Sequence, residues 1–236
     1  MKTVRKSCKD NWNAFMYEGA DFSKSINDIP YCPTTAENIP RNIITWNEAV
    51  TLYNKEMKKD KSFFCDAFVC WYKDDYKFDG KGGIWHRYDY VLKVLKHFSG
   101  AITPDFSTFQ DFPEPLKIYN TSRMRVFGYW LSENGIKVIN NVRWGTAETY
   151  RYCFDGLPVN SIIAIGTVGG SPKKIVDRYR FEQGLYILVD LLTPHTIIVY
   201  GSANYPCFEY LKSKGITIVS FQSETSMAYS KGANHE

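Results

Sequence analysis

SIIAIGTV (residues 161–168) and HTIIVYG (residues 195–201) are short stretches in which nearly every residue is apolar. Strands buried on both faces have this composition, and they are typical of parallel sheets that helices cover on both sides. Between them lies RFEQGLYILVDLL (residues 180–192), which reads as a helix and is followed by Pro194. The order strand, helix, strand predicts a parallel βαβ unit, and this unit decides the class of the fold.

The same unit recurs along the chain, because short polar clusters follow strand-like stretches about every 30 residues. These junctions are WYKDDY (71–76), ITPDFS (102–107), VINNVRW (138–144), IAIGTVGG (163–170), IVYGS (198–202) and IVSFQSE (218–224). We therefore expect an α/β fold with a mostly parallel sheet of about six βα units. A partial or distorted TIM barrel fits best, since polar residues follow nearly every strand. The alternative, an open doubly wound sheet, would concentrate them at one switch point.

The first 60 residues differ from the rest of the chain. They contain prolines, polar turns and one helix-like stretch, TWNEAVTLYNKEMKKD (residues 45–60), which begins with a capping box formed by Thr45 and Glu48. This segment holds too little apolar material to fold alone. We interpret residues 1–60 as an irregular, partly helical leader that packs on an α/β domain of residues 61–236.

Two further helices are predicted from the spacing of apolar residues. WHRYDYVLKVLKHF (residues 85–98) has an apolar stripe, and we expect the helix to end at Gly100, as helices often end at glycine. LKIYNTSRMRVFGYWLSENG (residues 116–135) also repeats apolar residues at helical spacing, and its Asn-Gly pair is a typical stop.

The composition excludes several classes of protein. A net charge of +4 over 236 residues is too small to indicate nucleic-acid binding by itself. The six cysteines form no CxxC pair and no Cys-His cluster at zinc spacing, so we expect free thiols in a reduced, cytoplasmic protein. The start of the chain is basic and polar, unlike a signal peptide, and no apolar run of about 18 residues indicates a membrane span.

Carboxylates follow two of the predicted strands. Asp74, Asp75 and Asp105 come directly after strand ends, and Asp155 lies in an FDG turn. Two carboxylates that face each other across a pocket can act as acid and base, or as nucleophile and acid in glycosyl chemistry. They can also hold a magnesium ion. We predict catalytic roles for Asp105, Asp75 and Asp155, although Asp155 before a glycine is also a common turn former.

A second polar cluster ends the next strand. Asn140, Asn141, Arg143 and Trp144 are consecutive or nearly so, and buried amides at a strand end must find hydrogen-bond partners. An amide pair can bind a base edge or sugar hydroxyls while the indole stacks on a ring. Hydrogen bonds to neighbouring loops are the alternative. We predict ligand-binding roles for all four residues.

Phosphate contacts are the third prediction. GTVGGSPKK (residues 166–174) follows a buried strand, and its backbone N–H groups would cradle a phosphate unless it is a solvated surface loop. The predicted ligand-binding residues here are Thr167, Gly169 and Gly170, with Ser202 after the next strand. Arg123, on the long helix, would reach a phosphate or form an internal salt bridge with Asp105 or Asp111. We assign no metal ligands, and the cofactor stays open.

Several segments resemble a family of phage, plasmid and integrative-element proteins grouped as domain of unknown function 4417. The stretches that carry the resemblance are IPYCPTTAENIPRNIITWNEA (29–49), PDFSTFQDFP (104–113), YNTSRMRVFGYWLSENGIKVINNVRW (119–144), YRYCFDGLPVNSIIAIGTVG (150–169), F-x-x-G-L (181–185) and IIVYGS (197–202). The chain departs from the family at KDDYKFDGKGG (73–83), where related proteins are shorter and more acidic. The resemblance implies a mobile-element setting and brings no established activity.

Two hypotheses for function follow. The first is an enzyme that acts on a nucleoside, a nucleotide or nucleic acid, with Asp105 as its main acid-base or nucleophilic group; glycosidic chemistry suits the carboxylates, amides and aromatic residues. The second is a non-catalytic accessory factor that binds DNA or protein. A cavity lined by Asp105, Asn141 and Thr167 would favour the enzyme. The sequence leaves the oligomeric state open.

Overall fold

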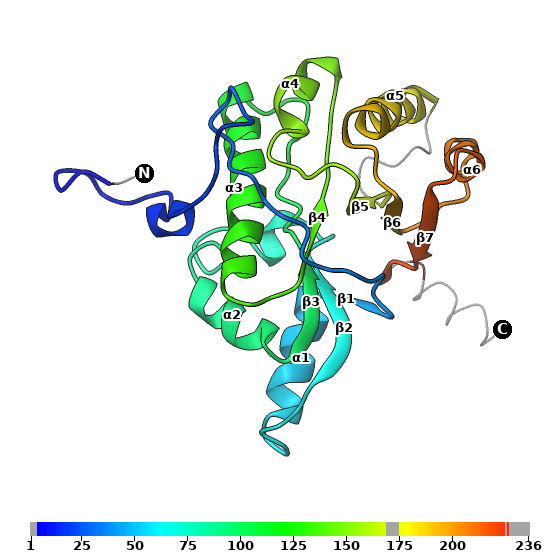
Figure 1. Cartoon of the computed structure of the whole chain (residues 1–236). Coiled ribbons are helices and arrows are strands. Elements are labelled where there is room, and N and C mark those ends of the chain that lie inside the picture. Colours follow the sequence, from blue (N-terminus) through cyan, green and yellow to red (C-terminus); the bar gives the residue numbers. More distant parts are fainter. Residues whose placement is uncertain (1–3, 169–174, 225, 227–236) are drawn as a thin grey trace.

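The structure is a computed structural model that describes residues 4–168, 175–224 and 226. Within these residues, seven parallel strands pair in chain order from β1 to β7 and form one curled sheet (Figure 1). The strands are β1 (Ile43–Thr45), β2 (Cys65–Cys70), β3 (Phe98–Ile102), β4 (Val138–Asn141), β5 (Ile162–Gly166), β6 (Thr196–Tyr200) and β7 (Thr217–Phe221). The predicted α/β class and the partial TIM-barrel arrangement are confirmed.

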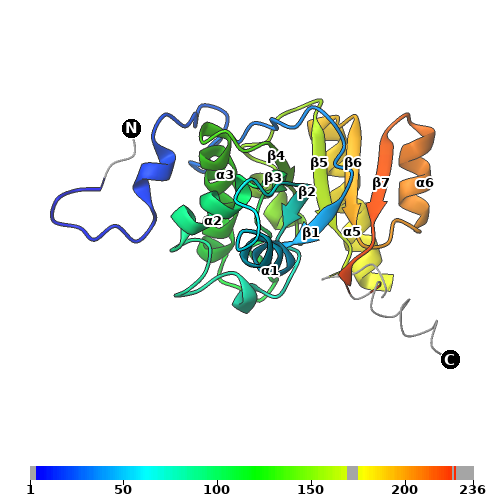
Figure 2. The same ribbon diagram turned by 90° about the horizontal axis from the view of Figure 1, so that it is seen from below.

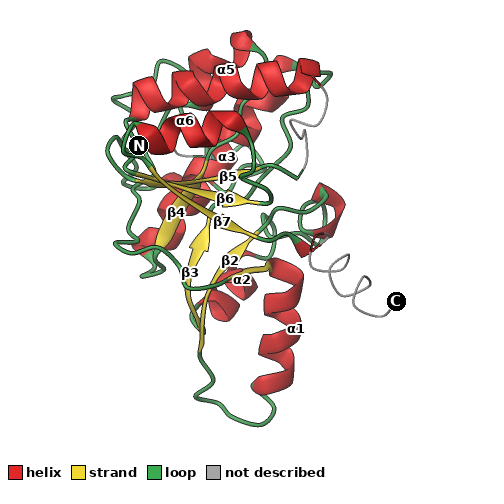
Figure 3. Ribbon diagram, turned by 90° about the vertical axis from the view of Figure 1, so that its right-hand side faces the viewer, coloured by secondary structure: helices red, strands yellow, loops and turns green. Residues whose placement is uncertain are grey.

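Helices cover the outer face of the curled sheet (Figures 2 and 3). The α-helices are α1 (Trp46–Glu56), α2 (Tyr88–Leu95), α3 (Glu114–Glu133), α4 (Tyr150–Cys153), α5 (Ile175–Leu192) and α6 (Pro206–Ser213). Three 3₁₀ helices add single turns at η1 (Ala14–Tyr17), η2 (Asp75–Lys77) and η3 (Ala147–Thr149). The half barrel therefore has a helical outer layer and an inner concave face.

Apolar side chains pack on both faces of the sheet. One outer cluster joins β2–β4 to α1–α3, and a second joins β5 and β6 to α5 and α6. A third cluster lies inside the curve and takes alternate residues of the strands, among them Phe68, Cys70, Ile102, Ile139, Ala164 and Ile198. Burial on both faces explains why the strand sequences read as continuous apolar runs.

Strand alternation decides which side chains at the strand ends point inward, because successive residues face opposite sides of a sheet. On β4, Ile139 belongs to the inner cluster and Val138 to an outer one. Asn141 therefore faces the inside of the half barrel, whereas Asn140 faces the outer layer. The same alternation turns Thr167 outward, since Gly166 continues the inward series on β5.

The sequence-based prediction of about six units missed the first strand. Residues 43–45 lie within the predicted leader, and they pair with β2 in parallel. Thr45 is the N-cap of α1, and its predicted capping box with Glu48 is confirmed. The leader thus supplies the first βα unit of the sheet.

The predicted role of Gly100 was wrong. The helix ends at Leu95, and Gly100 lies in the middle of β3. A Cβ atom at this position would come within 2.4 Å of the Phe68 ring, so the glycine allows the ring on β2 to lie against β3.

In the part of the chain that the structure describes, no helix combines the length and the apolar character that crossing a membrane requires.

Candidate active site

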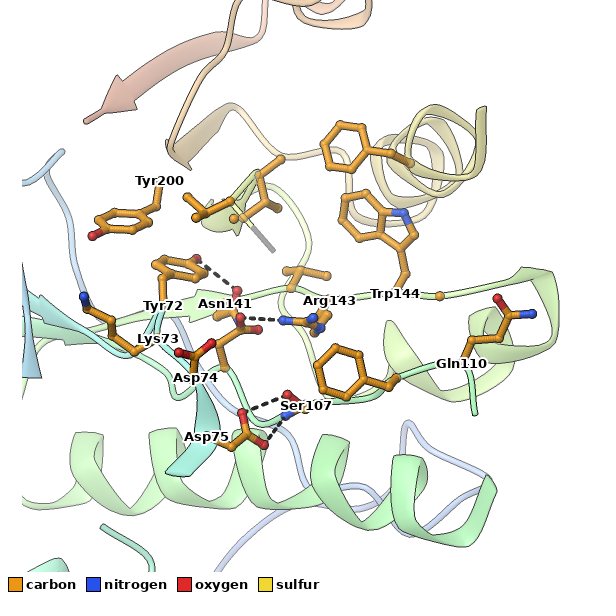
Figure 4. A pocket seen from close by; sticks show the side chains of 18 of the residues that line it. Tyr72, Lys73, Asp74, Asp75, Ser107, Gln110, Asn141, Arg143, Trp144 and Tyr200 are labelled. Carbon is orange, nitrogen blue, oxygen red and sulfur yellow. Dashed lines mark hydrogen bonds and ion pairs between the residues drawn. The ribbon is translucent and has the colours of Figure 1, made fainter. Parts of the chain in front are cut away.

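A cavity of about 800 Å³ opens where the carboxyl ends of the strands meet inside the half barrel (Figure 4). Parallel α/β folds place their sites at this edge, because the loops after the strands converge there. The polar and charged side chains that line it, apart from the aromatic residues, come from the end of β4, from the loops after β2, β3, β4 and β7 and from α5: Lys73, Asp74, Asp75, Lys77, Asp105, Ser107, Gln110, Asn141, Arg143, Thr146, Asp177, Arg180, Ser223 and Glu224.

Four side chains form a connected chain of hydrogen bonds at the centre of the cavity. The Arg143 guanidinium donates to Asp105 Oδ2 at 2.6 Å, and Asn141 Nδ2 donates to Asp105 Oδ1 at 2.9 Å. The Tyr72 hydroxyl in turn donates to Asn141 Oδ1 at 2.9 Å. Asp105 is thereby fixed in one orientation by groups from neighbouring strand ends.

Asp75 is the second carboxylate of the cavity. It accepts hydrogen bonds from the Ser107 backbone N–H at 3.0 Å and from the Ser107 hydroxyl at 2.8 Å, which bind the loop after β2 to the loop after β3. Burial raises the pKa of Asp75, the nearby negative charge of Asp105 raises it further, and the Ser107 hydrogen bonds act in the opposite direction. This half-buried environment therefore favours the protonated form of Asp75 more than water does.

Aromatic rings form two walls of the cavity. Tyr72 and Tyr200 stack with their ring centroids 4.9 Å apart and an interplanar angle of 15°. Burial raises the pKa of both phenols, so both keep their protons at neutral pH. On the other side, Trp144 lies against Phe181 of α5 with a centroid distance of 5.2 Å. A flat ligand can bind between such walls.

Gly184 allows α5 to approach Trp144 closely. A Cβ atom at this position would come within 2.0 Å of the indole Cδ1 atom, which no packed structure accepts. We expect Gly184→Ala to push the indole into the cavity and to lower the free energy of unfolding by about 1–3 kcal/mol, as overpacking does. Urea unfolding followed by tryptophan fluorescence measures this change, and Gly82→Ala is the control, because Gly82 has open space around it and no positive φ. An unchanged midpoint for Gly184→Ala would contradict the close packing.

The segment after β7 joins the two edges of the half barrel. Glu224 forms an ion pair with Lys73, and it accepts a hydrogen bond from the Thr45 hydroxyl at the end of β1. Its backbone N–H also donates to the Tyr200 hydroxyl at 3.3 Å. β1 and β7 are not paired, so these side-chain contacts connect the first and last strands in place of a ladder.

The structure brings together five of the predicted site residues, all of which line the cavity: Asp75, Asp105, Asn141, Arg143 and Trp144. The predicted neighbours Asn140 and Thr167 point away from it, as strand alternation requires. Asn140 Nδ2 donates to the Cys32 carbonyl at 3.0 Å, and the Thr167 hydroxyl donates to the Ser202 carbonyl at 2.9 Å. Ser202 is exposed and its hydroxyl accepts from the backbone N–H of Asn204.

Asp155 lies outside the cavity lining. Its carboxylate accepts from Ser25 Oγ at 2.6 Å and from Asn27 Nδ2 at 3.0 Å, so it ties the N-terminal segment to the turn after α4. The structure assigns it this structural role and does not place it near Asp105, so its predicted catalytic role is not supported.

Arg123 also serves the structure. It was predicted to bind a ligand, with an internal salt bridge to Asp105 or Asp111 as the alternative. The structure shows a salt bridge, and its partner is Asp79, at 3.0 and 2.8 Å. Its guanidinium lies over the Phe106 ring, 3.8 Å from the centroid. The predicted residues Gly169 and Gly170 lie outside the described residues.

Sequence reasoning missed several residues of the site. Tyr72 and Tyr200 stand at the ends of β2 and β6 on the inward side, and alternation counted from a known inward residue would have found both. Ser107 and Glu224 act through contacts between loops that are distant in sequence, and no local signal marks them. Among the described residues, no group of three or more His, Cys, Asp or Glu side chains is arranged to hold a metal ion.

The chain is similar to phage proteins. The Gene 1 protein of Mycobacterium phage L5 is 36% identical over 184 residues, which cover 78% of this chain and 75% of that protein. The Gene 1 protein of Mycobacterium phage D29 is 31% identical over 185 residues, which cover 78% of this chain and 63% of that protein, so the chain spans less than two thirds of this relative. No solved structure matches the chain. The model of the Domain of unknown function (DUF4417) matches residues 22–222. The chain therefore belongs to the DUF4417 family, which has phage members.

Proposed function

We propose that this protein is an enzyme that binds a nucleotide or nucleoside unit in the cavity and cleaves or exchanges its N-glycosidic bond. One observation carries the proposal. Two carboxylates in different environments, Asp75 and Asp105, line one cavity that also has aromatic walls. Glycosidic chemistry typically uses a pair of carboxyl groups, one as the acid and the other as the base, nucleophile or stabilising charge.

The walls suit the parts of such a ligand. The Trp144 indole offers a flat face for a base, and the stacked Tyr72 and Tyr200 rings limit the opposite side. Asp105 and Asn141 have oxygen and nitrogen atoms suited to ribose hydroxyl groups, and Arg143 or Lys73 suits a phosphate. A cavity of about 800 Å³ lies within the range of sites for small ligands.

The proposed reaction divides the work between the two carboxyl groups. Asp75, in its protonated form, gives its proton to the nitrogen of the departing base as the bond from that nitrogen to C1′ breaks. The Asp105 carboxylate stabilises the positive charge that develops on the sugar. Water, or a second base in the exchange reaction, then bonds to C1′ and gives up a proton, which Asp105 accepts and passes to solvent. Asp75 takes up a proton from solvent, which restores the starting state of both carboxyl groups.

The test is the release of free base. Purified protein is incubated with nucleosides, nucleoside 5′-monophosphates and short oligonucleotides, and bases are separated by liquid chromatography. We expect base to accumulate from at least one of these substrates. A protein that binds none of them and releases no base would overturn the proposal.

The pH dependence of Asp75 gives a sharper prediction. Because its folded-state pKa is raised above the unfolded value of 3.8, ionising Asp75 costs stability, and this cost appears as the pH rises from 3.8 through the folded-state pKa. In Asp75→Asn the amide oxygen can still accept from the Ser107 backbone N–H, and the amide nitrogen can donate to the Ser107 hydroxyl, which then acts as the acceptor. The variant is therefore expected to be more stable than the wild type at pH 7 and equally stable at pH 3. The same variant loses base release at every pH.

Thermal unfolding at both pH values measures the first effect, and the chromatographic assay measures the second. Asp66→Asn is the matched control, since Asp66 is exposed on β2 and hydrogen-bonded to a serine as Asp75 is. A stability gain for Asp75→Asn that is the same at pH 3 and pH 7 would contradict the raised pKa.

A second candidate is a non-catalytic binding protein of a phage or plasmid that uses the same cavity. The observation in its favour is that both carboxylate oxygens of Asp105 already accept hydrogen bonds, from Arg143 and from Asn141. It would bind a nucleotide without releasing base, and Asp75→Asn would leave that binding unchanged.

A further inference from the structure

We infer that the substrate unit of this cavity belongs to a single strand of nucleic acid and is not a free nucleotide. This inference rests on the proposed function and concerns the rim of the cavity, which its chemistry does not use. The rim carries exposed aromatic rings and cations that form no ion pair among the described residues, and this combination is the one that proteins use to hold a single strand.

Two exposed aromatic rings line the mouth and come from different loops. Tyr76 in η2 is 79% exposed and Phe109 after β3 is 52% exposed. Phe109 packs on Phe112 at a centroid distance of 5.3 Å, which fixes one edge of the ring and leaves the remainder to solvent. Two exposed rings that line the same cavity and come from different loops give neighbouring bases surfaces on which to stack.

Cations accompany both rings. Lys77 Nζ lies 5.6 Å from the centroid of the Tyr76 ring. Beside Phe109, Lys117 Nζ donates to the Gln110 carbonyl at 3.0 Å and Arg180 donates to Gln110 Oε1 at 2.9 Å. Within the described part of the chain, these three cations contact no carboxylate at ion-pair distance. Glu148 lies near two of them: a hydrogen bond with Thr146 lowers its pKa most, and the charges of Lys117 and Arg180 lower it further, without an ion-pair contact to either cation.

The cations form two groups: Lys77 and Arg180 line the cavity at different places, and Lys117 lies just outside the lining, where it reaches Gln110 beside Arg180. Lys117 and Arg180 meet at Gln110, whereas Lys77 lies with Tyr76 on the loop after β2. Each group of cations can bind one phosphate, and a nucleic-acid strand has a phosphate on both sides of every internal nucleotide. The arrangement therefore matches a nucleotide that enters the cavity while its neighbours stay on the rim.

The position of the carboxylates favours nucleic acid that is not base-paired. The carboxylates lie inside the cavity, and a base within a duplex cannot reach them unless it leaves the stack. A strand that is already unpaired avoids this cost. Neither DNA nor RNA is selected by the rim, because the stacking rings and cations recognise features that the two share.

Binding of labelled oligonucleotides tests the inference. The probes are unstructured DNA and RNA oligonucleotides of about 12 nucleotides, compared with the matching 5′-monophosphates and with a duplex. We expect the single strands to bind more tightly than the monophosphates and the duplex, with an affinity that falls as salt rises. Phe109→Ala should weaken strand binding by about 5- to 100-fold, as loss of a stacking ring does.

Variants that remove a cation should change the salt dependence of binding. Lys77→Ala and Lys117→Ala should each flatten the dependence of log affinity on log salt by about 0.7, the value for one phosphate on a single strand. The controls are Lys93→Ala on α2 and Tyr210→Ala on α6, an exposed lysine and an exposed tyrosine outside the cavity lining, which should bind like the wild type.

The outcomes separate the inference from the proposed function. If monophosphates release base and single strands bind no better than they do, the strand inference is overturned and the function stands. If single strands bind through Phe109 and Lys117 but no substrate releases base, the inference stands and the chemistry is overturned. Strand affinity that is equal in the wild type and all rim variants would also overturn the inference.

Discussion

Asp105→Asn is expected to lower the rate of base release by about 100- to 10,000-fold, the range for loss of an acid-base group. The substitution keeps the size of the side chain, and its oxygen can still accept from Asn141. It removes the negative charge that the proposed mechanism places beside the sugar. Because that charge matters most in the transition state, kcat should fall far more than ligand affinity.

Rate and binding are measured on the same preparation, by chromatography of the free base and by titration with the monophosphate. Asp66→Asn again serves as the control for removal of a carboxylate. The amide group that Asp105→Asn introduces would face the Arg143 guanidinium, so thermal unfolding must confirm that the variant is folded. Wild-type rates in folded Asp105→Asn would eliminate Asp105 from the chemistry.

Arg125→Ala is expected to lower the free energy of unfolding by about 3–5 kcal/mol, because three buried carbonyl groups lose their donor at about 1–3 kcal/mol each. Arg125 is almost completely buried in α3 and donates to three backbone carbonyls: those of Asp155 at 3.0 Å, Cys153 at 2.9 Å and Asn141 at 3.1 Å. Burial lowers its pKa to about 10, so it stays charged at neutral pH. Its loss leaves three buried carbonyl groups without this donor.

Arg125→Ala should also disturb the cavity, since the backbone carbonyl of Asn141, which lines the cavity, is one of the three hydrogen-bond acceptors of Arg125. Denaturant unfolding gives the stability change, and Arg151→Ala is the control: Arg151 pairs with Glu114 at the surface, where an ion pair contributes little to stability. Arg125→Lys should lie between the alanine variant and the wild type. A loss for Arg125→Ala no larger than that for Arg151→Ala would contradict the role of this network.

The fold class was predictable because parallel strands that are buried on both faces appear in the sequence as nearly continuous apolar runs. The runs at β5 and β6 and the helix between them were enough to predict parallel βα units. β1 escaped detection, since it has only three residues and lies beyond a proline-rich segment. Gly100 was read as a helix stop because local sequence does not reveal that a ring from the neighbouring strand lies against it.

The position of the candidate site was predictable from the sequence, but only some of the residues that line it were. Asp75, Asp105, Asn141, Arg143 and Trp144 reach the cavity because the strand ends converge there. Continuous apolar runs hide which alternate residues point inward, and Asn140 and Thr167 were included for that reason.

Other contacts of the site and its surroundings depend on tertiary packing. The partner of Arg123 is Asp79, from a loop separated from it by a whole βα unit, and the partners of Asp155 lie in the N-terminal segment. Glu224 reaches Lys73 from the opposite edge of the sheet. Such pairs have no spacing that a single sequence displays.

A crystal structure of the Asp75→Asn variant with a bound nucleoside 5′-monophosphate tests the central claim most directly. Adenosine and thymidine monophosphates are suitable probes, and the variant prevents turnover while it keeps the fold. We predict the base against the Trp144 indole and C1′ of the sugar between the substituted side chain and Asp105. A nucleotide bound elsewhere, or a cavity that stays free of it at saturating concentration, would contradict the assignment of this cavity.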